Sequence, residues 1–345
     1  MANSSKEIKC VVWDLDNTLW EGTLLEDEEV RLKPEIEALI DELDGRGILH
    51  SIASKNDYDL AMGKLREFGI ERYFLYPEIH WNPKSSSVAR IQKNLNIGMD
   101  TLLFIDDQPF ERDEVQSVHA EVTCIDADMY LGLLDEPRLN PRYITQDSRR
   151  RRLLYLENME REQDEEEFEG PQEKFLAELD MHFTISLAAE EDLQRAEELT
   201  VRTNQLNATG VTYSYEDLDR FRRSPDHMLL VCELIDRYGS YGKIGLALIE
   251  TKQDCWHLKL LLMSCRVMSR GVGTVLLSHI MQEAKVHGAK LLADFRKTDR
   301  NKMMHIAYRF ANFKEVSSDR DGNAVLENDL SRIQPFPPYL RVDVP

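Results

Sequence analysis

Apolar and amphipathic segments alternate regularly through residues 9–127. Four apolar, strand-like runs cover residues 9–15, 48–54, 101–107 and 121–127. Helical patterns lie between them at residues 34–46, 57–68, 85–95 and 109–119. Strands that alternate with helices predict a parallel sheet with both faces covered. The ligand site of such a sheet lies beyond the carboxyl ends of its strands.

A different order of elements follows residue 180. The strand-like runs of this region are residues 182–188, 228–235, 244–251, 256–267 and 291–295. The helical patterns are residues 190–205, 214–223, 273–287 and 301–312. This order is typical of an acetyltransferase-like α/β fold. A highly charged, helix-favouring segment at residues 148–180 separates the two regions, so we expect domains at residues 1–147 and 181–345.

Length and charge narrow the classes of protein. A chain of 345 residues is typical of two domains. The formal net charge of −20 is unsuited to nucleic acid, and no apolar run is long enough to span a membrane. The five cysteines are scattered without a Cys-x-x-Cys pair, and the N-terminal residues lack the apolar core of a signal sequence. We therefore expect a cytoplasmic protein that binds neither nucleic acid nor membrane.

The most specific motif is an Asp-x-Asp-x-Thr sequence directly after the first apolar run. It consists of Asp14, Asp16 and Thr18. Alternate residues of an extended segment point to the same side, so the two carboxylates can share one site. One carboxylate can attack phosphorus and touch a metal ion, while the other protonates the leaving oxygen. Two such carboxylates also require a nearby cation.

Three further groups follow strand-like runs in the places that phosphoryl transfer needs. Ser54 ends the second run, and Lys84 offers positive charge to a phosphoryl group. Asp106 and Asp107 end the third run and offer the oxygen ligands that Mg²⁺ prefers. Taken alone, a lysine such as Lys84 is ordinarily a surface residue, and an Asp-Asp pair is ordinarily part of a solvated turn. The prediction of a phosphoryl-transfer site therefore depends on the order of all these groups along the chain. The candidate phosphate- or substrate-binding residues of this region are Thr18, Ser54, Lys55, Asn56 and Lys84.

In order and context these residues resemble the haloacid-dehalogenase (HAD) superfamily. The resemblance implies an aspartyl-phosphate on Asp14, acid–base catalysis by Asp16, and phosphate binding by Ser54 and Lys84. The Mg²⁺ ligands that it implies are Asp14, Asp106 or Asp107, and the main-chain carbonyl of Asp16. The intervals between the motifs are too short for a separate cap domain. The expected fold class is α/β, with a HAD-like parallel-sheet Rossmannoid domain without a large cap, followed by a GNAT-like α/β domain.

The second region contains a thiol beside two arginines. Segment 262–274 joins a strand to a helix and contains Cys265. GNAT-type acetyltransferases bind pyrophosphate here, but Met268 stands where they have Arg or Gln. Cysteine is often only a small buried hydrophobe. Alternatively, Arg266, Arg270 and the helix N-terminus favour a thiolate, which can form an acyl thioester.

Polar residues cluster at the end of the helix expected over residues 190–205. Arg202, Asn204 and Gln205 form this cluster. Such a run is either a helix cap in a solvated turn or a set of hydrogen-bonding groups for a polyol or phosphate. Separate arginines at residues 149–152 and 222–223 are either solvated helix faces or a docking patch for an acidic protein.

The motifs of both regions together resemble the FkbH-like family, the glyceryl transferases and phosphatases of polyketide biosynthesis. The similar segments are residues 11–20, 104–112, 202–205 and 264–267. The resemblance implies transfer of a glyceryl unit from 1,3-bisphosphoglycerate to the phosphopantetheine thiol of an acyl carrier protein, for which Cys265 is the candidate thioester carrier. One alternative is a Mg²⁺-dependent phosphatase of a small metabolite with a non-catalytic GNAT-like domain. Others are a non-enzymatic binding module and an N-acetyltransferase with an inactive phosphatase region.

Overall fold

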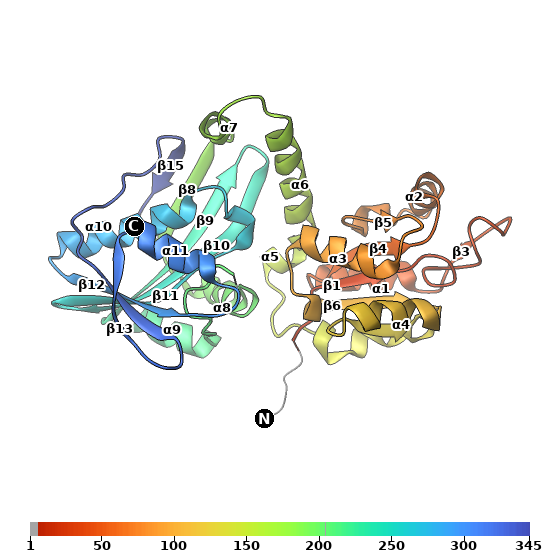
Figure 1. The fold of residues 1–345 in the computed structure, drawn as a ribbon, viewed down its shortest axis with the longest axis horizontal. Helices are drawn as coiled ribbons and strands as arrows, with labels where there is room; N and C mark the ends of the chain where they lie inside the picture. The colour runs from red at the N-terminus through yellow and green to blue at the C-terminus, as the bar shows by residue number, and fades with distance from the viewer. Residues whose placement is uncertain (1–5, 204) are drawn as a thin grey trace. The chain divides into compact units, whose positions relative to one another are not determined.

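The computed structural model describes residues 6–203 and 205–345 of the chain. The chain divides into two compact units, Met1–Leu156 and Glu157–Pro345, and each has its own sheet (Figure 1). The division falls within helix α6 (Arg151–Glu167), inside the charged segment that separates the two sequence patterns. No helix among the described residues has both the length and the apolar character needed to span a membrane.

A five-stranded parallel sheet forms the centre of the first unit. Its strands, in spatial order, are β5 (Glu78–Ile79), β4 (Leu49–Ser54), β1 (Cys10–Trp13), β6 (Leu102–Asp106) and β7 (Thr123–Asp126). Strand β1 lies in the middle, and all four of its residues are buried. A strand buried on both faces reads as a continuous apolar run, which is why the sequence pattern located it.

Helices cover this sheet. They are α1 (Ile36–Gly45), α2 (Tyr58–Glu67), α3 (Lys84–Leu95), α4 (Pro109–Val118) and α5 (Gln146–Arg149), with short 3-10 helices at Glu71–Tyr73, Met99–Thr101, Ala127–Asp135 and Pro137–Leu139. Helix α1 buries one apolar face, and α2 packs into the same core. Helix α3 packs beside α4. Asp57 caps α2 by accepting a hydrogen bond from the Leu60 N–H, and Pro109 occupies the first turn of α4.

The intervals between the sheet strands are short. Between β1 and β4 lie only the hairpin of β2 (Trp20–Glu21) and β3 (Arg31–Leu32) and helix α1. Between β4 and α3 lie only α2, one 3-10 turn and β5. The described residues of the first unit therefore contain no large cap, as the spacing of the motifs predicts.

An eight-stranded mixed sheet forms the second unit. Its strands, in spatial order, are β13 (Phe313–Ser318), β14 (Asn323–Asn328), β12 (Lys290–Arg296), β11 (Cys255–Met263), β10 (Gly239–Lys252), β9 (His227–Asp236), β8 (Met181–Leu187) and β15 (Leu340–Asp343). The pairs β11–β12 and β8–β15 are parallel, and the other neighbours are antiparallel.

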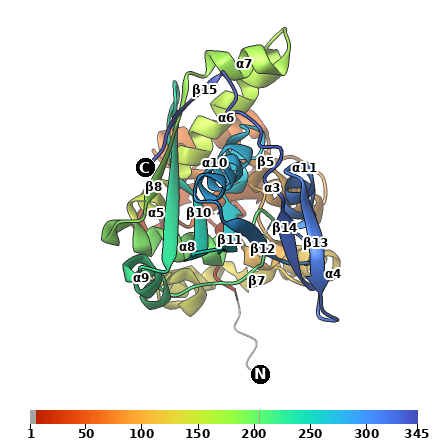
Figure 2. The same cartoon turned by 90° about the vertical axis from the view of Figure 1, so that its left-hand side faces the viewer.

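Two cores pack on opposite faces of this second sheet. Helices α7 (Gln172–Glu178), α10 (Val272–Val286) and α11 (Lys302–Phe310) contribute to the larger core, and Figure 2 shows α10 lying against the sheet. Helices α8 (Leu193–Arg202) and α9 (Tyr215–Arg223) contribute to the smaller one, after a 3-10 turn at Glu190–Asp192. Successive side chains of β9, β10 and β11 point to opposite faces of the sheet, so these strands contribute residues to both cores.

In the first unit the sequence pattern missed the short strands β2, β3 and β5. In the second unit it missed three strands and misplaced strand ends, including the start of β10, which was expected at residue 244 and lies at Gly239. The strand expected at residues 256–267 is wrong in its last residues, because β11 ends at Met263 and a 3-10 turn follows at Cys265–Val267. Strands β13, β14 and β15 lie at the edges of the sheet or beside them. Five of the six residues of β13 are exposed, so this strand has little apolar signal.

Candidate active site

The carboxyl end of β1 positions the first carboxylate. Asp14 directly follows β1, and its N–H donates a hydrogen bond to the Ile105 carbonyl at 2.9 Å. The pairing of Trp13 with Ile105 places Asp14 beside Asp106, the last residue of β6. Two carboxylates that are distant in the sequence therefore meet at one edge of the sheet because β1 and β6 are parallel neighbours.

Lys84 lies between these carboxylates. It is the first residue of α3 and is only 3% exposed. Its Nζ donates to Asp14 Oδ1 at 2.6 Å and also to Asp106 Oδ2. Burial raises the pKa of Asp106 to about 7, and the Asp14 carboxylate adds to this effect while Lys84 opposes it. A single ammonium group thus shares its charge between two buried acids.

Asp107 completes a group of oxygen ligands. Carboxylate oxygens of Asp14, Asp106 and Asp107 lie within 4.8 Å of one another. Asp107 Oδ1 is buried and has no hydrogen-bond partner in the described part of the chain. Both oxygens of Asp106 have donors, namely Lys84 and the Gln108 N–H. The three carboxylates carry more negative charge than the single ammonium group of Lys84 balances, and one of their oxygens has no partner. Such a set of oxygen ligands fits Mg²⁺.

The Asp16 carboxylate lies outside this group of ligands and has partners of its own. Its Oδ1 accepts hydrogen bonds from Trp20 Nε1 at 2.8 Å and the Leu24 N–H at 3.0 Å. Its Oδ2 accepts from Asn56 Nδ2 at 2.9 Å. Burial is the largest effect on the carboxyl and raises the pKa of Asp16 above its ordinary value. A positioned carboxyl with a raised pKa suits a general acid. Any contact of Asp16 with a metal would come from its main-chain carbonyl.

The remaining predicted residues of the first unit surround these acids. Thr18 Oγ1 donates to Asp14 Oδ2 at 3.3 Å and accepts from the Asp107 N–H at 3.2 Å. Ser54 ends β4 and is 3% exposed, and its hydroxyl has no partner among the residues that the structure describes. Lys55 forms an ion pair with Glu111 at 2.7 Å. Thr18 therefore positions the acids, whereas the Ser54 hydroxyl can bind a phosphoryl oxygen.

Two groups in this site escaped the sequence interpretation. Trp20 holds Asp16, and Glu111 holds Lys55. Glu111 Oε2 is buried without a partner in the described chain. The position of Trp20, four residues after Asp16, was a usable signal because a tight turn brings such residues together. Its backbone N–H folds back to the Leu15 carbonyl. Glu111 lies on α4, within the similar segment 104–112, but its residue type and position in the sequence did not indicate a contact with Lys55.

In the second unit, Cys265 lies in the 3-10 turn after β11 and is partly buried. Arg266 Nε donates to Ser264 Oγ at 3.3 Å. Arg270 is 2% exposed and forms an ion pair with Glu165 at 2.9 Å. Glu165 therefore compensates the positive charge of Arg270 where it lies, and the expectation that Arg270 favours a thiolate stays a prediction. Arg266 directly follows Cys265 in the chain, and helix α10 begins at Val272.

A separate segment closes the gap between β11 and β12. These strands pair only from Cys255 with Lys290 to Leu258 with Ala293. Beyond that point the Ala208 N–H donates to the Leu261 carbonyl, and the Arg296 N–H donates to the Ala208 carbonyl. Residues 206–208 thus connect both strands where their direct pairing has ended.

The same connection brings two sequence motifs together. The Met263 N–H donates to the Leu206 carbonyl at 2.9 Å, and Asn207 forms a bridge with Leu262. This antiparallel register brings Gln205 alongside the end of β11, where the Ser264–Cys265 pair follows. Arg202 ends α8 and lies 3.5 Å from Glu198. The predicted residue Asn204 lies outside the described residues.

The arginines considered for docking are engaged in contacts within their own units. Arg222 and Arg223 both pair with Asp219, at 2.7 and 2.9 Å. Arg152 pairs with Asp44, and Arg151 donates to the Gly47 carbonyl. These contacts favour a structural role for Arg151, Arg152, Arg222 and Arg223.

The fold of each unit defines its class. The first unit is a HAD-like parallel-sheet domain without a large cap, with its acids at the carboxyl ends of the strands. The second unit has a GNAT-like α/β fold, in which the parallel strands β11 and β12 diverge. The first class is the one expected for phosphoryl transfer, and the second is the one expected for acyl transfer.

No protein-family model matches the sequence, and no curated protein matches it. Among solved structures, the chain is similar to the N-terminal part of BF1531 from Bacteroides fragilis, described as containing a phosphatase domain complexed with Mg. The identity is 30%, the match covers 40% of this chain and 42% of that one, less than half its length, and the TM-score is 0.35.

Two acetyltransferase structures also match. One is the ribosomal-protein-S18-alanine N-acetyltransferase from Escherichia coli, with 18% identity, coverage of 42% of this chain and 90% of that one, and a TM-score of 0.33. The other is an N-acetyltransferase from Staphylococcus aureus Mu50, with 17% identity, coverage of 43% and 99%, and a TM-score of 0.33. All these TM-scores are below 0.5, so the fold classes depend on strand order and site geometry.

Replacement of Lys84 by alanine should destabilise the first unit. The substitution leaves Asp14 and Asp106 buried without their shared cation, and breaking a buried pair in this way costs about 3–5 kcal/mol. Urea unfolding without Mg²⁺ measures the loss, and added Mg²⁺ should restore part of it. Lys93→Ala, at an exposed position on the same helix, is the control. Equal unfolding midpoints for Lys84→Ala and the wild type would contradict this electrostatic account.

Mg²⁺ binding should strengthen as the pH rises. Asp106 has a pKa raised to about 7, so below that pH its carboxyl carries a proton that a metal ion must displace. Between pH 6 and pH 8 the apparent affinity should rise roughly tenfold, with proton release at the lower pH. Calorimetric titration in two buffers of different ionisation enthalpy measures both quantities. A pH-independent affinity would show that Asp106 does not ionise on binding.

Proposed function

We propose that the chain is a bifunctional glyceryl transferase and phosphatase of polyketide biosynthesis. Its substrate is 1,3-bisphosphoglycerate, and its product is a glyceryl thioester on an acyl carrier protein. The observation that supports this proposal most strongly is the buried cluster of Asp14, Lys84 and Asp106. Three hydrogen-bond donors hold Asp16 beside this cluster. The similarity of both domains to FkbH-like motifs supplies the substrate and the acceptor.

Asp14 and Asp16 perform the phosphatase reaction. An Asp14 oxygen attacks the phosphorus of the 3-phosphate ester, and the bond from phosphorus to the glyceryl oxygen breaks. Asp16 gives its proton to that oxygen, consistent with its raised pKa. Water then attacks the aspartyl-phosphate, with Asp16 accepting a proton and inorganic phosphate leaving.

Lys84 and Ser54 hold the transferring phosphoryl group in this proposal. Both are buried at the same edge of the sheet as Asp14. Lys84 neutralises the charge that develops on the phosphoryl oxygens, and the Ser54 hydroxyl donates a hydrogen bond to one of them. Asp14, Asp106 and Asp107 would hold Mg²⁺, whose charge would further stabilise the phosphoryl oxygens.

Cys265 performs the acyl transfer. Its thiolate attacks the carbonyl carbon of the acyl phosphate, and the bond from that carbon to the phosphate oxygen breaks, so that phosphate leaves. The thiol of phosphopantetheine then attacks the enzyme thioester, the bond between the acyl carbon and the Cys265 sulfur breaks, and the proton of the attacking thiol passes to the departing Cys265 sulfur. The backbone register that aligns residues 205–207 with the end of β11 supports this role, because it brings the predicted polar segment next to the turn that contains Cys265.

One observation favours a second candidate function. Arg270 is paired with Glu165, so one of the charges expected to activate Cys265 is already compensated. The second candidate is a Mg²⁺-dependent phosphatase of a small phosphorylated metabolite whose GNAT-like domain binds without catalysis.

Phosphate stoichiometry distinguishes the two candidates. The bifunctional enzyme should release two phosphates from 1,3-bisphosphoglycerate for each glyceryl group that it loads on a holo carrier. A phosphatase alone should release phosphate at a rate that does not respond to the holo carrier and should leave the carrier unmodified. The measurement is a coupled phosphate assay with parallel mass analysis of the carrier, and an apo carrier is the control.

A further inference from the structure

Helix α11 presents an exposed face that combines apolar and basic side chains. Met303, Ile306 and Phe310 are 48%, 43% and 79% exposed, and their spacing places them on one side of the helix. Lys302 and Arg309 border this stripe. The opposite side of α11 is anchored by Met304 and Tyr308 in the core, so the exposed face is held rigidly.

Positive charge is concentrated in the chain segment that contains α11, although the chain as a whole is acidic. Residues 296–312 contain five Lys or Arg residues and one Asp, a net charge of +4, whereas the whole chain has −20. Lys302, Arg309 and Arg332 are exposed and form no ion pair with any residue that the structure describes. The arginines of α9, in contrast, are paired with Asp219. An acidic partner would therefore meet uncompensated charge on α11.

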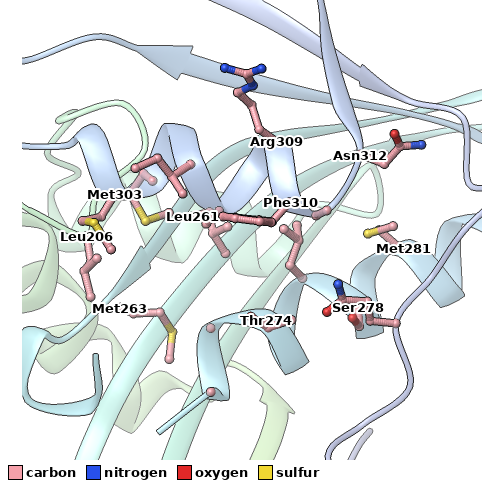
Figure 3. Close-up of a pocket in the computed structure, with 18 of the residues that line it drawn as sticks. Leu206, Leu261, Met263, Thr274, Ser278, Met281, Met303, Arg309, Phe310 and Asn312 are labelled. Atoms are coloured by element: carbon pink, nitrogen blue, oxygen red, sulfur yellow. The ribbon is translucent and has the colours of Figure 1, made fainter. Parts of the chain in front are cut away.

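A cavity of about 870 Å³ opens beneath the same face, between α11 and α10 (Figure 3). Met303, Arg309, Phe310 and Arg332 line it from the exposed side, and its apolar inner end includes Leu261. Figure 3 shows Arg309 extending away from the cavity. The volume lies within the range of ligand pockets, which is about 300–1,000 Å³.

The cavity wall connects this face to the proposed acyl site. Val267 and Met268 line the cavity, and both follow Cys265 closely in the chain. Cys265 itself is not among the lining residues. A partner on α11 could therefore direct a long, flexible arm along a wall formed by the same turn that contains the thiol.

We propose that the α11 face, consisting of Lys302, Met303, Ile306, Arg309 and Phe310 with the neighbouring Arg332, is the docking surface for the acyl carrier protein. This inference rests on the proposed function, which requires such a partner. Carrier proteins are generally acidic, so the unpaired cations on this face are complementary to them in charge. The apolar stripe of Met303, Ile306 and Phe310 can form the water-excluding centre of the interface.

A binding measurement tests the surface independently of the chemistry. The probe is a purified bacterial holo acyl carrier protein with a fluorescent label, and anisotropy gives the dissociation constant at several salt concentrations. The double variant Lys302→Glu with Arg309→Glu should bind at least about tenfold more weakly and should lose most of the salt dependence. The charge-matched control is Lys174→Glu with Lys285→Glu, at exposed positions that do not line the cavity.

A second pair of variants tests the apolar stripe. Phe310→Ala should weaken binding about tenfold, because a central aromatic anchor of an interface is removed. Val286→Ala on α10, where the side chain is also 79% exposed, should leave binding unchanged. Both side chains are on the surface, so neither variant should disturb folding.

Three results would overturn the docking surface: carrier binding by the charge-reversed variant at wild-type strength, no carrier binding by the wild type, or binding of the wild type to phosphatidylglycerol vesicles in place of the carrier. Failure of the proposed function has a different signature. In that case Cys265 would acquire no acyl group from 1,3-bisphosphoglycerate in the absence of carrier, whatever the binding results.

Discussion

Replacement of Asp14 by asparagine should lower the rate of phosphate release by about 10³-fold or more, equivalent to about 4 kcal/mol of activation free energy. Asparagine preserves the shape of the side chain, but its amide cannot attack phosphorus. It also removes one of three negative charges from the candidate Mg²⁺ ligands. Lys84 would keep its contact with Asp106, so the site should retain much of its packing.

The measurement is phosphate release from a generic phosphate monoester at saturating Mg²⁺. Asp128→Asn, at an exposed position after β7, is the matched control and should retain wild-type activity. A chelator should abolish the wild-type activity, and Mg²⁺ should restore it. Near-normal phosphate release by Asp14→Asn would contradict the assignment of Asp14 as the nucleophile.

Replacement of Cys265 by serine should abolish acyl transfer while leaving the phosphatase reaction intact. A thioester preserves much of the reactivity of the acyl phosphate, whereas an oxygen ester on serine would be a poor donor to the carrier thiol. The turn containing Cys265 is in the second unit, and the residues around Asp14 are in the first. Carrier loading should therefore fall by at least about 10³-fold with unchanged hydrolysis of a phosphate monoester.

Cys255→Ser provides the matched control, because Cys255 is also a partly buried free thiol of the second unit. After addition of 1,3-bisphosphoglycerate without carrier, peptide mass spectrometry should locate a glyceryl or phosphoglyceryl adduct on the peptide with Cys265. Hydroxylamine should release this adduct. Loading by Cys265→Ser at the wild-type rate would mean that the thiol is structural and that the carrier takes the acyl group directly.

The acids of the first unit were predictable because each follows a recognisable apolar run. The carboxyl ends of parallel strands meet at one edge, so Asp14, Ser54 and Asp106 could be grouped before their contacts were known. The sequence could not reveal how Lys84 divides its ammonium group between two acids. It also could not show that the Leu24 N–H donates to Asp16, because that contact depends on the conformation of the loop after β1.

The second unit was harder to predict because its site depends on distant pairings. The bridge of Asn207 to Leu262 determines which residues approach Cys265, and periodicity along one segment contains no information about such a bridge. The pairing of Arg270 with Glu165 spans 105 residues and compensates the charge of that arginine, which no local pattern could indicate. Edge strand β13 escaped detection because its side chains are mostly exposed.

Intact-protein mass spectrometry of a reaction containing the enzyme, 1,3-bisphosphoglycerate, Mg²⁺ and a holo acyl carrier protein tests the central claim most directly. The account predicts a carrier heavier by one glyceryl group, sensitive to hydroxylamine, that is absent with Cys265→Ser. With Asp14→Asn, the product should retain its phosphate on the enzyme or the carrier. A carrier of unchanged mass, while the enzyme consumes 1,3-bisphosphoglycerate and releases phosphate, would contradict the account and leave the chain a phosphatase alone.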